Sequence, residues 1–443
     1  LTTFYHIFYA SFAKSRFMTD VPFTSFLILS FLFVFLGINN SRLGLVGIGL
    51  MFGLFATLTR QIGLAIPLGF IATMLVHPVG RRLGRLRMCL LACGIGVLPW
   101  VAYEILLAYA GSTPITEHQV IHRILKAPLS KGFVVYVLSL ALRFGHAVGY
   151  CCLFVSPVVA VVCYHRPLSV LSKRILVISL LAFILLEIGL LSGIVDLPVI
   201  FLRNVIFNYG IGPVLLKDTY ILGETRTWTI QSPMFWLWAY WALLAAMTVL
   251  GHSVREAKSL AATWSADGAD SKAFLAFLAG FSGLIYFAAV LLSGLYDRYL
   301  IPIIAMMLIG LCAQYKRRDR MTSWVPAMVL GSIMLFIIGC FSILGTRDYF
   351  EMKRSLHKAH NFLMYELEED PCHVDGGFEF NGYHCYREGF KPRKNLSWWW
   401  VLQEHYVVTL GPLDGYGTVK VFPFRRWLGP PGGVYVLKPL DPK

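Results

Sequence analysis

The sequence VPFTSFLILSFLFVFLGI, residues 21–38, decides the fold class because it contains no charged residue over 18 positions. An α-helix of that length extends about 27 Å, close to the thickness of a bilayer's hydrocarbon core. Similar apolar runs follow along the chain. The full set of predicted spans is 21–38, 43–58, 61–76, 88–109, 148–164, 174–193, 234–250, 273–293, 298–313 and 324–344.

These runs are continuous and do not alternate between apolar and polar residues, so they indicate helices rather than the strands of a barrel. Composition agrees with a membrane protein. Of the 443 residues, 57% are hydrophobic and 14% are charged, and the mean hydropathy is +0.65. A typical soluble domain has about 25% charged residues, and disordered chains are poor in apolar ones. We therefore expect an all-α polytopic membrane protein with about ten helical spans.

Four short loops carry most of the chain's excess positive charge. Loops 77–87, 164–174, 251–272 and 314–323 hold 14 Lys and Arg against 4 Asp and Glu, which accounts for +10 of the net +15. Loops rich in Lys and Arg remain in the cytoplasm. The spans alternate consistently under that choice only if the chain breaks near Arg60. The excess of Lys and Arg in these loops therefore predicts the topology of the chain in the membrane, and no nucleic-acid partner is expected.

Residues 345–443 differ in character, with 13 Lys and Arg against 12 Asp and Glu. A helix is expected near 347–369, followed by strands at 398–402, 406–410, 418–422 and 434–437, with Gly- and Pro-rich turns between them. The chain is thus divided into a membrane domain, 1–344, and a small α+β domain, 345–443, outside the cytoplasm.

Two of the nine cysteines, Cys372 and Cys385, lie in this C-terminal domain, whereas the other seven lie in or at the spans. On the oxidising side of a membrane the two are expected to form a disulfide. The alternative is two free thiols. A zinc site that includes the flanking His373 and His384 is less favoured, because their spacing matches no usual ligand pattern.

Ionisable residues gather near the outer ends of the spans, where they are costly and usually mark function. Those selected as candidates are Asp20, Arg60, Glu117, His118, Asp297 and Arg298, with Glu104 and Glu187 as weaker ones. Structural alternatives exist for each. Asp20 could cap a helix, and Arg60 could extend to lipid headgroups. Asp297 and Arg298 could form a local ion pair, and Glu117 and His118 could lie on a solvated face.

Acids and arginines at one depth suit a particular chemistry. A carboxylate can take a proton from a hydroxyl or orient it, and arginine binds phosphate through paired hydrogen bonds. Apolar spans can hold an isoprenoid chain. A lipid-linked sugar phosphate combines these features, and arginine would stabilise the negative charge that grows on the departing phosphate.

Two motifs carry a resemblance to a known family. FMTDVPF at 17–23 is followed, after a span, by GLFATLTRQ at 53–61, and YDRYLIP at 296–302 opens a late span. With these motifs the chain resembles bacterial members of the GT-C glycosyltransferase superfamily, related to protein O-mannosyltransferases and to the lipid A aminoarabinose transferase. Tail segments around Trp398–Trp400, Gly415-Tyr416 and Arg426–Leu428 are also similar.

The resemblance implies a helical membrane bundle that uses a polyprenyl-phosphate sugar donor and a lipid, glycan or protein acceptor of the cell envelope. It implies a hexosyltransferase-type enzyme in the bacterial inner membrane, with its active site outside the cytoplasm. Asp20 is the catalytic candidate. The substrate-binding candidates are Arg60, Glu117, His118, Asp297, Arg298 and Tyr299. By family order the first span and first outer loop, which hold the main catalytic acid, precede Leu1, so Asp20 matches a second acid.

Two other functions remain open. A lipid or solute transporter would use the charges as a substrate path, although no internal repeat is seen and the charges lie at the rim rather than the midplane. A polysaccharide polymerase or ligase would use a lipid diphosphate. No P-loop, HExxH or GxSxG motif is present. No cofactor is certain from the sequence, and a divalent metal is left open.

Overall fold

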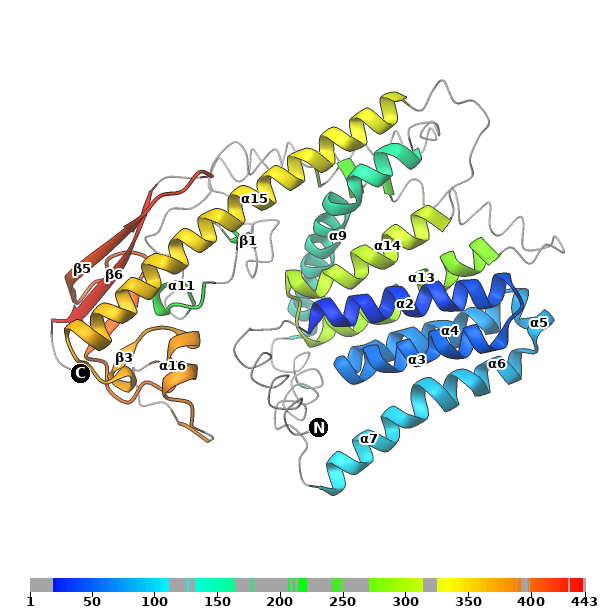
Figure 1. Ribbon diagram of the computed structural model, residues 1–443, viewed down its shortest axis with the longest axis horizontal. Coiled ribbons are helices and arrows are strands. Elements are labelled where there is room, and N and C mark those ends of the chain that lie inside the picture. Colours follow the sequence, from blue (N-terminus) through cyan, green and yellow to red (C-terminus); the bar gives the residue numbers. More distant parts are fainter. Residues whose placement is uncertain are drawn as a thin grey trace. The chain divides into compact units, whose positions relative to one another are not determined.

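The computed structural model describes residues 19–110, 132–163, 214–220, 271–313, 325–387, 399–428 and 431–440, together with short stretches and single positions between them. The chain forms two compact units. The first comprises residues 1–200 and 238–334, and the second comprises 201–237 and 335–443. Each is described separately below, and Figure 1 labels their elements.

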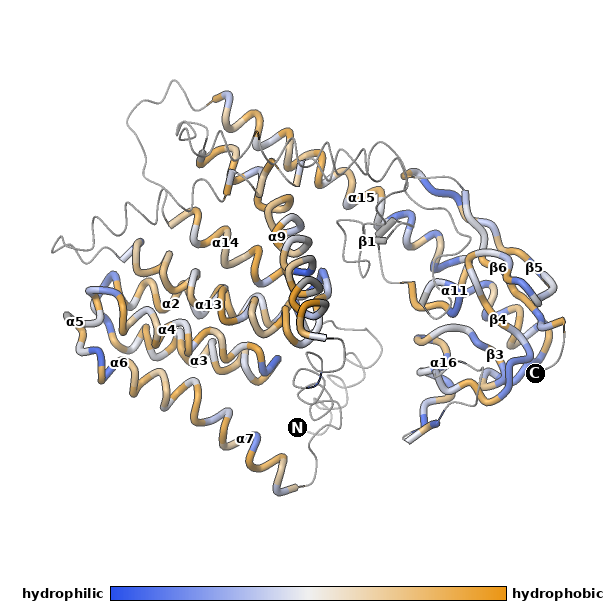
Figure 2. The backbone as a smooth tube through the Cα atoms, turned by 180° about the vertical axis from the view of Figure 1, so that it is seen from behind, coloured by the Kyte–Doolittle hydropathy of each residue, from blue (hydrophilic) through white to orange (hydrophobic). Residues whose placement is uncertain are grey.

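The first unit is helical. Its described elements are α2 (Asp20–Asn39), α3 (Leu43–Thr59), η1 (Gln61–Leu64), α4 (Ala65–Val76), α5 (Val79–Leu83), α6 (Arg85–Ala92), η2 (Cys93–Val97), α7 (Leu98–Tyr109), α9 (Phe133–Cys163), α13 (Ser271–Ser293), η3 (Asp297–Leu300), α14 (Ile301–Ala313) and the start of α15 (Val325–Asn361). Figure 2 shows that these helices are predominantly hydrophobic along their length.

Helices α2 and α3 form an antiparallel hairpin with close backbone contact. A Cβ atom on Gly49 would lie 2.7 Å from the backbone nitrogen of Val34, and one on Gly37 would lie 2.7 Å from that of Val46. Small residues allow such close approach between membrane helices, where dispersion forces drive association. One face of α2 is buried within the unit, through Phe23, Leu27, Phe31 and Val34.

Other faces of helices in the first unit expose large apolar side chains. Ile28 and Leu32 on α2 are 45% and 47% exposed, and Ile105 and Leu106 on α7 are 62% and 66% exposed. Exposure of these apolar faces to water would be unfavourable, whereas contact with lipid chains suits them. The first unit therefore has the surface expected of a membrane-embedded protein.

Five described helices are long and apolar enough to cross a membrane. They are Asp20–Asn39, Arg85–Tyr109, Arg143–Val162, Ser271–Ser293 and Val325–Glu366. Two shorter apolar helices, Leu43–Thr59 and Gln61–Val76, match further predicted runs. The predicted spans 174–193 and 234–250 fall largely outside the described residues. A mostly helical membrane protein is thus confirmed, whereas the number of ten spans stays a prediction.

The predicted break at Arg60 is confirmed. Arg60 adopts an extended conformation, with φ −152° and ψ 124°, between the end of α3 and the 3-10 turn η1. A Cβ atom on Gly63 would lie 2.6 Å from the Thr57 backbone nitrogen. A glycine is therefore needed where the chain doubles back against the end of α3.

The second unit is a small α+β fold. Its described elements are β1 (Ile206–Phe207), β2 (Gly210–Ile211), α11 (Lys217–Tyr220), the later part of α15, η5 (Phe362–Glu366), η6 (Pro371–His373), β3 (Val374–Asp375), α16 (Phe378–His384), β4 (Tyr406–Thr409), β5 (Tyr416–Phe424) and β6 (Gly432–Pro439). The main sheet has the order β3-β4-β6-β5, in which only β3 and β4 are parallel.

The later part of α15 packs on this sheet and forms the core of the unit. Its side chains Met352, Leu356 and Leu363 are buried together with Val408 and Val436 from the strands. At one end of the sheet Asp348 accepts hydrogen bonds from the backbone nitrogens of Trp427 and Leu428, each at 2.9 Å. Helix and sheet are therefore joined by both apolar and polar contacts.

Three of the four predicted strands of the tail are present, at 406–409, 416–424 and 432–439. The strand predicted at 398–402 is wrong, because the described part of that segment forms a turn in which Trp400 has a positive φ of 62°. Its indole packs against Phe378 in a tilted arrangement, with ring centroids 5.7 Å apart. Trp399 and Trp400 thus pack on α16 and do not extend the sheet.

Candidate functional site

The first unit brings Asp20 and Arg60 together in an ion pair. Asp20 is the first residue of α2 and is 3% exposed, and Arg60 follows the end of α3, so both lie at one end of the hairpin. The capping role considered for Asp20 is wrong, since Thr19 holds the N-cap position and Asp20 directs its carboxylate to Arg60. The Arg60 side chain, for which the alternative was contact with lipid headgroups, is directed to the Asp20 carboxylate.

Tyr299 lies between two arginines. Its ring centroid is 4.4 Å from the guanidinium carbon of Arg60 and 5.3 Å from that of Arg298. Cations are attracted to the face of an aromatic ring, and they interact more strongly where water is excluded. The motifs at 17–23, 53–61 and 296–302, which are far apart in sequence, therefore meet around this tyrosine.

Asp297 opens η3 and is 1% exposed. Its carboxylate accepts a hydrogen bond from the backbone nitrogen of Arg298 at 3.1 Å. This local contact orients the start of the 3-10 turn and so places Arg298 and Tyr299. Asp297 therefore has a supporting role, because it helps to position Arg298 and Tyr299.

A cavity of about 480 Å³ opens beside the ion pair. Arg60 and Tyr299 line it together with polar, aromatic and apolar side chains. The other lining residues are Thr19, Thr57, Leu58, Thr59, Gln61, Ile62, Trp100, Tyr103, Leu107, Tyr286, Val290 and Ser293. Cavities of this size hold small organic ligands, and mixed linings fix an apolar body with a few polar contacts.

The Trp100 indole nitrogen of the lining has no hydrogen-bond partner among the described residues, whereas the Tyr286 hydroxyl contacts the Arg60 side chain. Buried polar groups are normally satisfied, so unsatisfied ones in a cavity indicate a ligand or water. A third lining residue, Gln61, donates to the Glu104 carboxylate at 2.9 Å. Glu104, a weaker candidate from the sequence, is thereby held next to the cavity.

The structure thus brings Asp20, Arg60, Arg298 and Tyr299 into one place, with Asp297 supporting them. Glu117, His118 and Glu187 lie outside the described residues. Sequence reasoning missed Trp100, Tyr103 and Tyr286 as lining residues. Aromatic residues are frequent in spans, and only a polar tip within an otherwise apolar helix, as at Tyr286, could have marked them.

The second unit holds a separate buried polar cluster. Lys217 forms an ion pair with Glu404, and the Tyr416 hydroxyl donates to the same carboxylate at 2.5 Å. Asp375 is fully buried nearby, where its carboxylate contacts the Gly377 backbone and the Ser397 side chain. Burial raises the pKa of Asp375 to about 6, although the charge of Lys217 opposes this.

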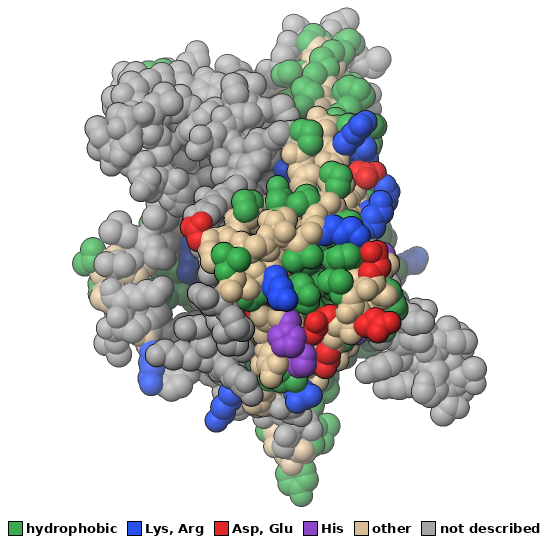
Figure 3. All heavy atoms as spheres, turned by 90° about the vertical axis from the view of Figure 1, so that its left-hand side faces the viewer, with side chains coloured by type: hydrophobic (Ala, Val, Ile, Leu, Met, Phe, Trp, Pro, Cys, Tyr) green, Lys and Arg blue, Asp and Glu red, His purple; other side chains and the backbone are tan. Residues whose placement is uncertain are grey.

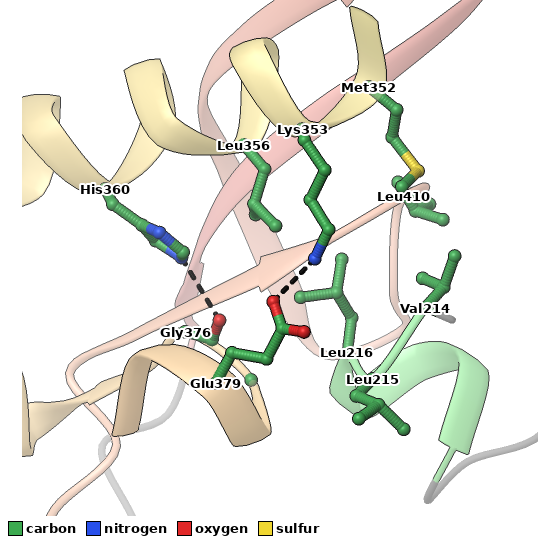
Figure 4. Close-up of a pocket in the computed structure, with 11 residues that line it drawn as sticks. Val214, Leu215, Leu216, Met352, Lys353, Leu356, His360, Gly376, Glu379 and Leu410 are labelled. Carbon is green, nitrogen blue, oxygen red and sulfur yellow. Dashed lines mark hydrogen bonds and ion pairs between the residues drawn. The ribbon is translucent and has the colours of Figure 1, made fainter. Parts of the chain in front are cut away.

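The pocket shown in Figure 4 lies in the second unit between α11, α15 and α16. Around it, Lys353 donates to Glu379 at 2.6 Å and His360 contacts the Gly376 carbonyl at 3.1 Å. Its volume is about 20 Å³, which holds about one water molecule. It is too small to be a substrate site.

One group in the described part of the chain combines three side chains able to ligate a metal, namely Glu369, His373 and His405. It belongs to the second unit and is separate from the Asp20 cavity. In comparisons with known proteins, no family model matches the chain, and neither the curated proteins nor the solved structures contain a match.

Proposed function

We propose that this protein is a membrane glycosyltransferase that moves a sugar from a polyprenyl-phosphate donor to a hydroxyl acceptor on the extracytoplasmic face. One observation carries the proposal. A buried carboxylate–arginine pair and a second arginine meet around Tyr299, at a cavity that also has an apolar side. The resemblance of the motifs at 17–23, 53–61 and 296–302 to the GT-C superfamily supports it.

The donor's parts have counterparts in the cavity. Leu58, Ile62 and Leu107 line it, and Leu58 is half exposed on the outside of α3. These side chains suit the first isoprene units of the lipid. Arg60 lines the cavity and offers its guanidinium group to the phosphate. Arg298 is not a lining residue, but it lies next to Tyr299, and its buried Nε atom has no hydrogen-bond partner among the described residues. Trp100 and Tyr286 would donate to the sugar.

The reaction balances as a substitution at the anomeric carbon. The acceptor oxygen forms the new glycosidic bond, the bond from the anomeric carbon to the phosphate oxygen breaks, and polyprenyl phosphate leaves with the electron pair. Arginine stabilises the charge that develops on that phosphate. Because the Asp20 carboxylate is engaged with Arg60, we assign Asp20 the positioning of this guanidinium. The acceptor's proton passes to a carboxylate base, the role that the main catalytic acid has in the family that these motifs resemble.

The test uses membranes that contain the protein and a panel of polyprenyl-phosphate donors with ¹⁴C-labelled sugars. Wild-type membranes should move label from the organic-soluble donor to an acceptor and release polyprenyl phosphate. Arg298→Ala should reduce this transfer by at least about tenfold, the effect of losing a charged hydrogen bond in the transition state. The matched control is Arg42→Ala, since Arg42 is exposed at the opposite end of the α2–α3 hairpin.

The runner-up, a lipid or solute transporter, gives a different product. It would carry the labelled donor across vesicles with the sugar–phosphate bond intact, and the helix interruptions at Arg60 and at the π turn Cys93–Val97 are the features that favour it. Intact donor that changes leaflet, without release of polyprenyl phosphate, would replace the glycosyltransferase by the transporter. Transfer unaffected by Arg298→Ala would remove Arg298 from the proposed site.

A further inference from the structure

Three side chains of the second unit converge on one small volume. Each of Glu369, His373 and His405 offers one ligating atom, and these atoms lie within 4.8 Å of one another. The Glu369 carboxylate oxygen is 2.8 Å from His405 Nδ1 and 3.7 Å from His373 Nδ1. The two imidazole rings have centroids 4.7 Å apart. Two imidazoles and one carboxylate are the side chains that bind zinc in many protein sites.

The backbone around these side chains is fixed by several bonds. Cys372, next to His373, is joined to Cys385 by a disulfide. The backbone nitrogen of His405 donates to the carbonyl of His373 at 2.9 Å, immediately before the parallel pairing of β3 with β4. The Glu369 nitrogen donates to the Leu363 carbonyl at 3.0 Å. The backbone at or next to each ligand is therefore held by hydrogen bonds or the disulfide, which lowers the ordering cost of binding an ion.

His405 carries a particular signature of a metal ligand. Its Nε2 atom lies 3.1 Å from the Gln403 side-chain oxygen, which can only accept a hydrogen bond. Nε2 is thus the donor, and Nδ1 faces the Glu369 carboxylate, which is also an acceptor. A proton on Nδ1 would satisfy this contact, and so would a cation between the two atoms. A ligating histidine typically donates its other ring nitrogen in this way, which fixes its tautomer.

We propose that Glu369, His373 and His405 bind one divalent transition-metal ion of the Zn²⁺ class. Bonds of about 2.0–2.2 Å in a tetrahedral site place ligand atoms about 3.3–3.6 Å apart, so modest side-chain rotations complete the geometry. Three protein ligands leave a position for water or an acceptor group. His405 is 47% exposed, and His373 is 27% exposed, which gives the ion a path from solvent.

Because the three side chains are only partly buried, a metal ion can reach them from solvent. Figure 3 shows a face on which histidine and acidic side chains lie next to one another at the surface. Within the described residues this is the one group of three or more His, Cys, Asp and Glu side chains whose ligand atoms converge in this way. The composition of two imidazoles and one carboxylate favours zinc over magnesium or calcium, which prefer oxygen ligands alone.

The test uses the full chain in detergent, with any affinity tag removed, stripped with a chelator and then dialysed against micromolar ZnCl₂. Metal analysis should find about one zinc per chain in the wild type. His405→Gln and Glu369→Gln should each weaken zinc binding by at least about tenfold. His357→Gln is the matched control, because His357 is exposed on α15 and contacts Asn361 outside the group.

A second measurement keeps the proposal testable if a variant is unstable. Co²⁺ in place of Zn²⁺ should give intense visible absorption from a tetrahedral site in the wild type and in His357→Gln, and weak absorption in His405→Gln. Zinc should also raise the midpoint of thermal unfolding of the wild type and of His357→Gln, but not that of His405→Gln, by linkage. Zinc bound equally by wild type and His405→Gln, or by neither, would overturn the site and leave an ion pair of Glu369 with the histidines.

Discussion

The ring of Tyr299 lies 4.4 Å from the guanidinium carbon of Arg60, a residue 239 positions earlier in the chain. This contact joins the turn after α3 to the start of η3. It also helps to orient Arg60, which contacts the Asp20 carboxylate and the Tyr286 hydroxyl as well. The proposed phosphate-binding group is thus held by one acidic and two aromatic neighbours, from two different parts of the chain.

Asp20→Asn should leave the Arg60 charge buried without a partner. Breaking one side of a buried ion pair costs about 3–5 kcal/mol, and the 18% exposure of the Arg60 side chain places the expected loss at the lower end. Thermal unfolding in detergent should report this loss, and transfer activity should fall. The double variant Asp20→Asn, Arg60→Gln should recover part of the stability but none of the activity, and equal losses in single and double variants would contradict the pairing.

Tyr299→Leu should separate the role of the aromatic face from that of the hydroxyl. Loss of the ring removes attraction to two guanidinium groups, worth about 1–2 kcal/mol in a partly buried site. Donor affinity should therefore fall about tenfold in Tyr299→Leu and change little in Tyr299→Phe. Titration of the labelled donor into purified protein measures both. A similar loss in Tyr299→Phe would show that the hydroxyl, and not the ring, matters.

The buried Asp375 should make the second unit more stable at mildly acidic pH. Burial raises the pKa of its carboxyl from 3.8 to about 6, so between these values the folded state binds more protons than the unfolded state. Stability therefore falls as the pH rises from about 4 to about 7, and the shift corresponds to about 3 kcal/mol. Asp375→Asn should flatten this slope when unfolding is followed against pH. An unchanged slope would assign the pH dependence to other groups.

The predicted orientation places the second unit outside the cytoplasm. A cysteine introduced at Tyr383, which is 84% exposed, should react with an impermeant maleimide on intact cells. A cysteine at the exposed Arg87, in the basic loop 77–87, should react only after permeabilisation. The parent protein with its native cysteines sets the background. The reverse labelling pattern would overturn both the topology and the proposed location of the site.

The parts of the fold that could be predicted from the sequence follow from short-range patterns. The apolar runs indicated α2, α3, α4, α13 and α14, and the break at Arg60 followed from the alternation of basic loops. Alternating apolar residues between turn signals indicated β4, β5 and β6. Such signals depend only on neighbours in the chain, so they do not require knowledge of packing.

The site was only partly predictable, because its members are joined by packing. Sequence analysis selected Asp20, Arg60 and Arg298 as charges in an apolar setting, but nothing in the sequence pairs Asp20 with Arg60 or places Tyr299 between arginines. The His373–His405 contact was missed for the same reason, since it depends on the parallel pairing of β3 with β4 across 32 residues. The zinc site considered from sequence used His384, which lies outside the group.

The close contact between α2 and α3 also bears on how the protein enters its membrane. Gly37 and Gly49 set the register of the hairpin, so Asp20 and Arg60 come together at its open end. Under the predicted topology that end must cross the bilayer during synthesis. An unpaired carboxylate and an unpaired guanidinium would each raise the free energy of crossing the bilayer, whereas the Asp20–Arg60 ion pair crosses with no net charge. The glycines can thus ease insertion as well as shape the mature site.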